Sequence, residues 1–262
     1  MEGNSMDATA TRTPIRFNRL LPYWAVLQTD LSQTAHSWVF RLWVLLSLLS
    51  AAGYGLYKYG IHHEAGIVQS ASMQTGDLLR GVAVASLAFV ALLSVSAVSS
   101  ERSTVADAVL CRGISRYQYF MAKWHARTAV VLAAFTVLSA IVLTGYHYLL
   151  DPDLTLGGGV AATAIALAAL ACVIAWGVTI GALANGTVIA ITIFWMILYG
   201  TILLCSFLPD PFPSPTYVMT QMRSILKGNF DEYRVGRIVA GFLIAATLGA
   251  AVGLVGFRRK DV

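Results

Sequence analysis

The chain has 262 residues, of which 57% are hydrophobic and only 12% are charged, and its formal net charge is +5. A soluble domain carries about 25% charged residues, so this composition excludes an ordinary soluble domain and indicates a polytopic membrane protein. In a soluble protein the positive charge would suggest a nucleic-acid partner. Here the basic residues gather at the ends of apolar segments, so we expect membrane lipid, and no nucleic acid, as their partner.

Two different segments precede the first apolar run. Residues 1–19 are polar and small, and we expect them to form a disordered cytoplasmic N-terminus. Residues 20–37 predict an amphipathic helix, with Pro22 near its start and polar side chains such as Asp30 on one face. The apolar face has residues at spacings of three and four, namely Leu20, Trp24, Leu27, Leu31 and Ala35. We favour an elbow helix lying on the cytoplasmic leaflet over an ordinary flanking helix.

Six apolar runs follow, each near the roughly 20 residues that a helix needs to cross about 30 Å of hydrocarbon. The runs are Trp38–Tyr57, Leu79–Val98, Thr128–Leu150, Val160–Ala182, Thr187–Leu208 and Ile238–Phe257. We therefore predict an all-α polytopic membrane protein with six transmembrane helices, in which residues 20–262 form a single domain. Only Ala184, Asn185 and Gly186 separate the fourth run from the fifth, which predicts a tight helical hairpin.

Basic residues set the expected orientation. Most of the 18 lysines and arginines lie before or at the start of the first run, between the second and third runs, and in the tail. By the positive-inside rule, these segments face the cytoplasm. We therefore expect a protein of the plasma membrane (the inner membrane of a bacterium) with both termini cytoplasmic. Residues 209–237 are then the longest external connection, and their apolar helical face predicts a re-entrant or interface-lying helix pair.

The stretch 99–127 is a polar interruption between two apolar runs, and it contains its own helix signals. Thr104 with Asp107 is a variant of the capping box, and the glycine that ends this short helix is suited to a left-handed stop. Ser115 with Gln118 is a second capping box, which predicts the start of the next helix. A linker that only connected two spans would not need these signals, so we interpret the stretch as a docking surface.

The sequence lacks the motifs that mark several kinds of functional site. The sequence contains no G-x-x-x-x-G-K-[ST], so the chain cannot bind ATP through a P-loop of its own. We expect no enzyme, cofactor or metal site, since His62, His63 and Glu64 have no further His or Cys near them. No run contains a central charged residue of the kind that self-powered carriers bury. Energy for any transport would therefore arrive from outside the membrane, and 99–127 is the obvious place to receive it.

Two pairs of glycines have the spacing G-x-x-x-G. They are Gly177 with Gly181 in the fourth run and Gly249 with Gly253 in the sixth. Such pairs permit helix backbones to approach closely. The sequence leaves two alternatives open for them, namely packing within one subunit and contact at a dimer seam.

Nearly the whole chain after about residue 20 resembles the permease subunits of type-2 ABC exporters. In that family the segment after the second span typically reads E-R-x-x-G-T-L, then L-L-S-x-P-[IV]-S-R and a lysine. The matching residues here are Glu101, Arg102, Thr104, Val105, Leu110, Cys111, Arg112, Ile114, Ser115, Arg116 and Lys123, and the basic tail Phe257–Asp261 is also similar. Ser103 replaces the usual Gly and Gly113 the usual Pro, and both residues remain compatible with a cap or a turn.

The resemblance implies that two permease copies, identical or different, pair in the membrane and that two ABC ATPase subunits bind them from the cytoplasm. ATP and Mg would be bound by the ATPases and not by this chain. A coupling helix after Glu101 would contact each ATPase through an apolar stripe and directional polar side chains. The residues expected to take part are Glu101, Arg102, Thr104, Val105, Asp107, Val109, Arg112, Ser115 and Arg116. The implied function is export of an unidentified substrate.

Two other functions remain open at this point. A membrane scaffold or assembly factor without transport would bind partners other than an ATPase, and it would tolerate substitution of Glu101 or Arg112. An intramembrane enzyme would need a nucleophile–base pair or a set of metal ligands within the spans, and neither is evident in the sequence.

Overall fold

The computed structural model describes residues 20–99, 114–207 and 215–259 of the chain. Within these residues the secondary structure is helical, apart from an isolated β-bridge between Ser70 and Asp151. The helices are α1 (Leu21–His36), α2 (Trp38–Glu64), α3 (Ala71–Ser99), α5 (Arg116–Leu149), α6 (Leu156–Leu183), α7 (Thr187–Phe207), α8 (Pro215–Leu226) and α9 (Glu232–Arg259). Six of them, all but α1 and α8, are long and apolar enough to cross a membrane, which confirms the predicted all-α fold class with six spans.

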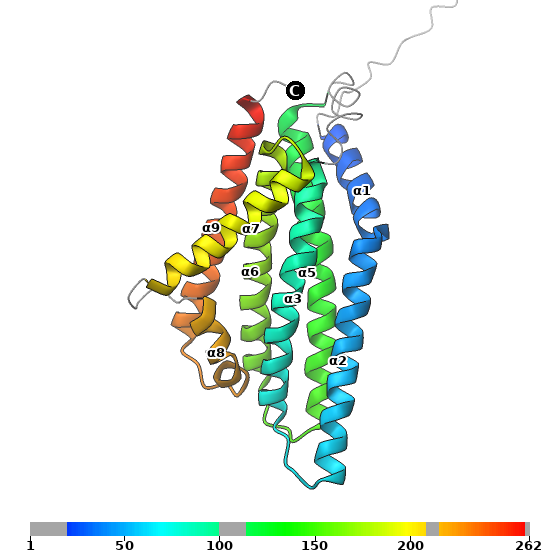
Figure 1. Ribbon diagram of the computed structural model, residues 1–262, viewed down its shortest axis with the longest axis vertical. Helices are drawn as coiled ribbons and strands as arrows, with labels where there is room; N and C mark the ends of the chain where they lie inside the picture. Colours follow the sequence, from blue (N-terminus) through cyan, green and yellow to red (C-terminus); the bar gives the residue numbers. More distant parts are fainter. Residues whose placement is uncertain (1–19, 100–113, 208–214, 260–262) are drawn as a thin grey trace, which may run out of the picture.

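The helices α2, α3, α5, α6 and α9 run side by side along the long axis of the molecule (Figure 1). α6 occupies the middle of this bundle and packs on α3, α5 and α9. α1 begins, α5 begins and α9 ends at one end of the bundle, which we call the α1 end. The connection between α2 and α3, the connection between α5 and α6, and the short helix α8 lie at the opposite end, which we call the α8 end.

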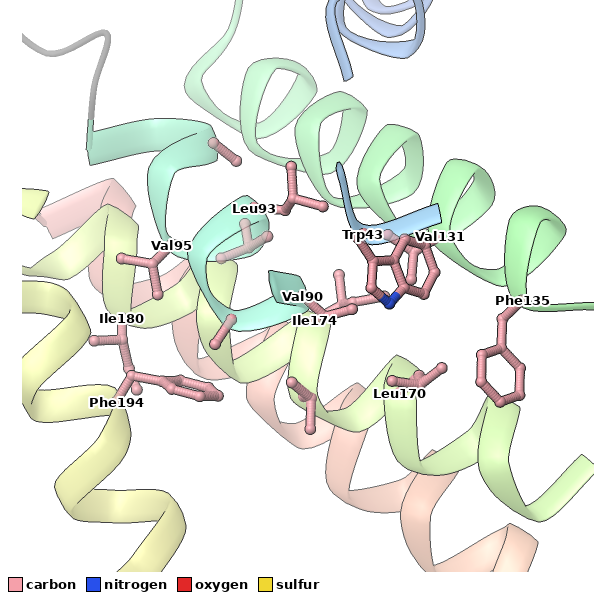
Figure 2. Packing of buried hydrophobic residues seen from close by; sticks show 14 of the residues in the cluster. Trp43, Val90, Leu93, Val95, Val131, Phe135, Leu170, Ile174, Ile180 and Phe194 are labelled. Carbon is pink, nitrogen blue, oxygen red and sulfur yellow. The ribbon is translucent and has the colours of Figure 1, made fainter. Parts of the chain in front are cut away.

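The buried core draws side chains from seven helices, and the residues labelled in Figure 2 come from five of them. Trp43 of α2 is 1% exposed, and its indole N–H donates to the Ser86 hydroxyl of α3 over 2.8 Å. Val131 and Phe135 of α5 lie in the same core. Further labelled members are Val90, Leu93 and Val95 of α3, Leu170, Ile174 and Ile180 of α6, and Phe194 of α7. Because Ile238 and Phe257 of α9 belong to the same cluster, all six spans are packed as one unit.

The four glycines of the G-x-x-x-G pairs all lie at close contacts within the chain. A Cβ atom on Gly181 would lie 2.3 Å from the carbonyl oxygen of Val95 in α3, and one on Gly177 would lie 2.6 Å from the Ser94 Cβ. A Cβ atom on Gly253 would lie 2.4 Å from the Thr179 hydroxyl of α6. Gly249 approaches the Trp176 ring, and its carbonyl accepts a hydrogen bond from Thr179 over 2.8 Å. These residues let α3 and α9 approach α6.

The helices extend beyond the predicted runs where the added residues are polar. α5 begins at Arg116 instead of Thr128, and α3 begins at Ala71 instead of Leu79. Hydropathy marks only the part of a helix that lies in hydrocarbon, so polar turns at its ends are not counted. The segment 209–237, which the sequence predicts to be external, has one separate helix among its described residues. Its described part contains α8 and a turn at Gly228 (φ 84°), and its last residues are the first turns of α9.

We expect the substitution Gly181→Ala to destabilise the bundle, because the new methyl group would collide with the α3 backbone. Overpacking of this kind costs about 1–3 kcal/mol. Gly200→Ala in α7 is the matched control, since its Cβ would have no neighbour within 4 Å. Thermal unfolding in detergent should show a lower midpoint for Gly181→Ala and no loss for Gly200→Ala. Equal midpoints for the two variants would contradict the close α3–α6 contact.

Candidate functional site

A buried group of three charged side chains joins α1 to α5 at the α1 end. The Asp30 carboxylate of α1 lies 2.8 Å from the Lys123 ammonium group of α5. Its other oxygen lies 3.3 Å from the Arg127 Nε atom. The side chains of Asp30, Lys123 and Arg127 are 1%, 3% and 9% exposed. We call these three residues the Asp30 cluster.

The local sequence explains why the cluster forms there. Lys123 and Arg127 are four residues apart on α5, so they lie on one face of that helix. Between and beside them, Ala122 and Ala126 are fully buried against Leu27 of α1. The two small alanine side chains let α1 approach α5 closely, and this approach brings the Asp30 carboxylate between the two cations.

The contact face of α1 combines residues from both predicted faces. Leu27 of the predicted apolar face packs on α5, whereas Leu20 and Trp24 of the same face are 59% and 60% exposed. Asp30 of the predicted polar face is buried in the same contact with the first turns of α5. A carboxylate that meets two cations is more stable buried than an unpaired one, so pairing outweighs the apolar periodicity here.

The sequence contained a usable signal for this cluster. Asp30 is the only acidic residue in the segment 20–37, and Lys123 and Arg127 stand at helical spacing in the basic stretch. Nothing in the pattern of one segment shows that the other segment lies against it. The pairing becomes visible only when the two helices are placed side by side.

The predicted capping box at the start of α5 is confirmed. The Ser115 hydroxyl accepts from the Gln118 backbone N–H, and the Gln118 side chain accepts from the Ser115 backbone N–H, both over 3.2 Å. Arg116 is half-buried in the first turn. The other predicted coupling residues lie outside the residues that the structure describes, namely Glu101, Arg102, Thr104, Val105, Asp107, Val109 and Arg112.

The end of α3 is bonded to the start of α7 at the α1 end. The Ser99 hydroxyl donates to the Val95 carbonyl over 2.8 Å. A hydroxyl has one proton, so the Thr187 hydroxyl is the donor in the 2.9 Å contact between Thr187 and Ser99. The tight turn between α6 and α7 is therefore held beside the point where the polar stretch begins.

α5 connects the two ends of the bundle. A helix of 34 residues is about 51 Å long, which exceeds the roughly 30 Å of hydrocarbon that it would cross. Lys123 and Arg127 precede Thr128, where the apolar run of α5 begins, so the Asp30 cluster lies beside this run and not within it. The cluster can therefore be a structural link without the cost of charges at mid-membrane.

A second polar network closes the α8 end. The Asp153 carboxylate accepts hydrogen bonds from the hydroxyls of Ser70 and Ser72 and from the Ser72 backbone N–H (2.7 Å). Lys227, just after α8, lies 3.2 Å from the same carboxylate. Partial burial alone would raise the pKa of Asp153, but these hydrogen bonds outweigh it and lower the pKa to about 2. Asp153 is therefore ionised at neutral pH and ties α8 to two loops.

The histidines considered as metal ligands lie at the end of a helix, where one of them accepts a backbone hydrogen bond. His62 and His63 lie in the last turn of α2, and the His62 Nδ1 atom accepts from the Gln69 backbone N–H over 3.3 Å. Among the residues in the described ranges, no three or more His, Cys, Asp or Glu side chains are grouped as metal ligands.

The comparisons with known proteins identify no relative, since no protein-family model and no curated protein matches the chain. The fold itself defines the class: this is a polytopic helical integral membrane protein with six long apolar helices. Any narrower assignment rests on its own residues, and above all on those at the α1 end.

We expect Asp30→Asn to destabilise the protein strongly, because it leaves two buried cations without their anion. Breaking a buried pair in this way costs about 3–5 kcal/mol. Asp30→Lys should be worse, and adding Lys123→Asp to it should restore most of the lost stability, since the exchanged pair again joins opposite charges. The measurement is thermal unfolding in detergent for the wild type, both single variants and the exchange. Failure of the exchange to recover stability would show that the charges do not interact as described.

Proposed function

We propose that this protein is the permease subunit of an ATP-driven exporter of the type-2 ABC kind, which moves a substrate across the membrane with a separately encoded ATPase. The observation that supports this most is that the segment from Glu101 to Arg116 resembles the corresponding segment of those permeases. Its position in the bundle agrees with this resemblance. That segment connects the end of α3 to the start of α5, at the end of the bundle where α1 begins and α9 ends.

The proposed coupling route begins at this segment. A push on it would act directly on the start of α5, which its capping box keeps helical up to Ser115. Since the Asp30 cluster joins α1 to α5, we expect the two helices to move together. The bond between Ser99 and Thr187 would carry the same displacement from α3 to the turn before α7. Displacement of packed helices at one end is a common way to open a path at a subunit interface.

The remaining parts of the proposed assembly lie outside this chain. Two ATPase subunits would bind ATP and Mg, and a second permease copy would complete the membrane part. The position of α7 supports the proposal of a second copy. α7 packs on α3 and α6 through Ala190 and Phe194, whereas its later turns project away from the other helices (Figure 1). Large apolar side chains on these turns are exposed, for example Met196 (71%) and Leu203 (62%).

We expect an ATPase to co-purify with the protein extracted from its native membrane, and hydrolysis by that complex to depend on the coupling segment. Glu101→Ala or Arg112→Ala should weaken ATPase binding about tenfold or more, as truncation of central interface residues commonly does. Lys58→Ala is the matched control, because Lys58 lies on α2 near the α8 end. Pull-down and ATP-hydrolysis rates give the readouts.

Two results would contradict the proposal. A native complex that contains partners but no ATPase would favour a scaffold or assembly factor. Unchanged ATPase binding and hydrolysis in both Glu101→Ala and Arg112→Ala would remove the coupling role of the segment.

A further inference from the structure

A groove of about 650 Å³ lies between α5 and α6 near the α8 end. We call it the α5–α6 groove. Its volume is within the range of roughly 300–1,000 Å³ that is usual for small-molecule sites. It is lined on α5 by residues from Thr136 to Tyr148 and on α6 and the preceding loop by residues from Leu154 to Leu167. It plays no part in the proposed coupling route and does not depend on the proposed function.

The groove has a polar mouth and an apolar interior. Thr144 and His147 of α5 and Thr155 at the start of α6 lie toward the α8 end. Deeper in the groove, Ala140 faces the part of α6 that contains Ala164 and Leu167. The lining of α6 from Leu156 to Leu167 is about 16 Å long at the helical rise per residue. A site that is polar at one end and apolar along such a length fits a head group followed by a hydrocarbon chain.

The position of the mouth agrees with the depth of lipid head groups. α5 ends at Leu149, so Thr144 lies about 8 Å from the end of that helix. The head-group region on each side of the hydrocarbon is about 6 Å thick. With the end of α5 at the outer limit of this region, His147 is level with the phosphate group of a lipid and Thr144 is near its ester groups. A free solute would not need an apolar channel that continues into the hydrocarbon.

One hydroxyl in the wall of the groove has no partner. The Thr163 Oγ1 atom is buried and makes no hydrogen bond to the described residues, whereas Thr136 across the groove donates to the Leu132 carbonyl over 2.8 Å. A buried unpaired hydroxyl is unfavourable. Thr163 itself lines the groove, and threonine has two χ1 rotamers available in helices, so its hydroxyl can reorient when a ligand is bound. An ester carbonyl there would accept its proton.

We propose that the α5–α6 groove binds one glycerophospholipid of the surrounding membrane. One acyl chain lies along the apolar interior, the ester carbonyl accepts from Thr163, and the head group lies among Thr144, His147 and Thr155. The site recognises the lipid through its shape and through one hydrogen bond. It is therefore more selective than ordinary contact with lipid chains.

The test is native mass spectrometry of the delipidated protein titrated with a diester phosphatidylethanolamine and with its diether analogue, which lacks the carbonyls. We expect one tightly bound diester lipid per chain. Ala164→Phe should lower the affinity for this lipid about tenfold, because the larger side chain fills the interior of the groove. Val160→Trp should have the same effect. Val160 lines the groove and is 63% exposed, so it can be enlarged without disturbing the core. Ala88→Phe, at an exposed alanine of α3 outside the groove, should bind as the wild type does.

The two lipids test the hydrogen bond separately. The wild type should bind the diester about fivefold more tightly than the diether, as one hydrogen bond predicts, and Thr163→Val should remove this difference. Thr192→Val is the control, because that exposed hydroxyl donates to the Val188 carbonyl of its own helix. Wild-type affinity in both Ala164→Phe and Val160→Trp would overturn the site. Equal binding of the two lipids by the wild type would overturn the role of Thr163.

Discussion

The buried attraction between Asp30 and the two cations of α5 is the interaction on which the α1 end depends. One carboxylate faces Lys123 and Arg127, and all three side chains are nearly inaccessible to solvent. If α1 moved away from α5, these charges would be left without partners in a poorly solvated place, at a cost of several kcal/mol. The cluster therefore makes α1 a fixed part of the bundle, although α1 is not among the six helices that are long and apolar enough to cross a membrane.

The rest of the bundle is held by contacts of a different kind. Gly181 and Gly253 allow α3 and α9 to approach α6, and core residues of seven helices pack together in one cluster. At the α8 end, the Asp153 carboxylate ties α8 to the neighbouring loops through hydrogen bonds and the ion pair with Lys227. Charged or polar networks thus close the two ends, while close packing holds the middle. This division suits a protein whose middle lies in hydrocarbon, where small residues permit helix association.

The features that sequence could predict are those with a local physical cause. The six spans, the start of α2 at Trp38 and the capping box at Ser115 follow from hydropathy and from side chains that bond to their own helix end. The burial of Asp30 could not be predicted in this way, because its partners lie about 90 positions away in the chain. The Asp153 network has the same origin, since its members come from three separate segments. Pairing between distant segments leaves no periodic signal.

The central claim is that the Asp30 cluster makes α1 and α5 one rigid body. Pulsed electron–electron spin resonance measures this directly, with nitroxide labels at two exposed positions, Gln28 on α1 and Tyr117 on α5, in a background without native cysteines. We expect a single narrow distance distribution for the otherwise wild-type protein and a broad one when Asp30→Asn is added. An equally narrow distribution in the Asp30→Asn variant would contradict the claim, because it would show that other contacts hold α1 in place.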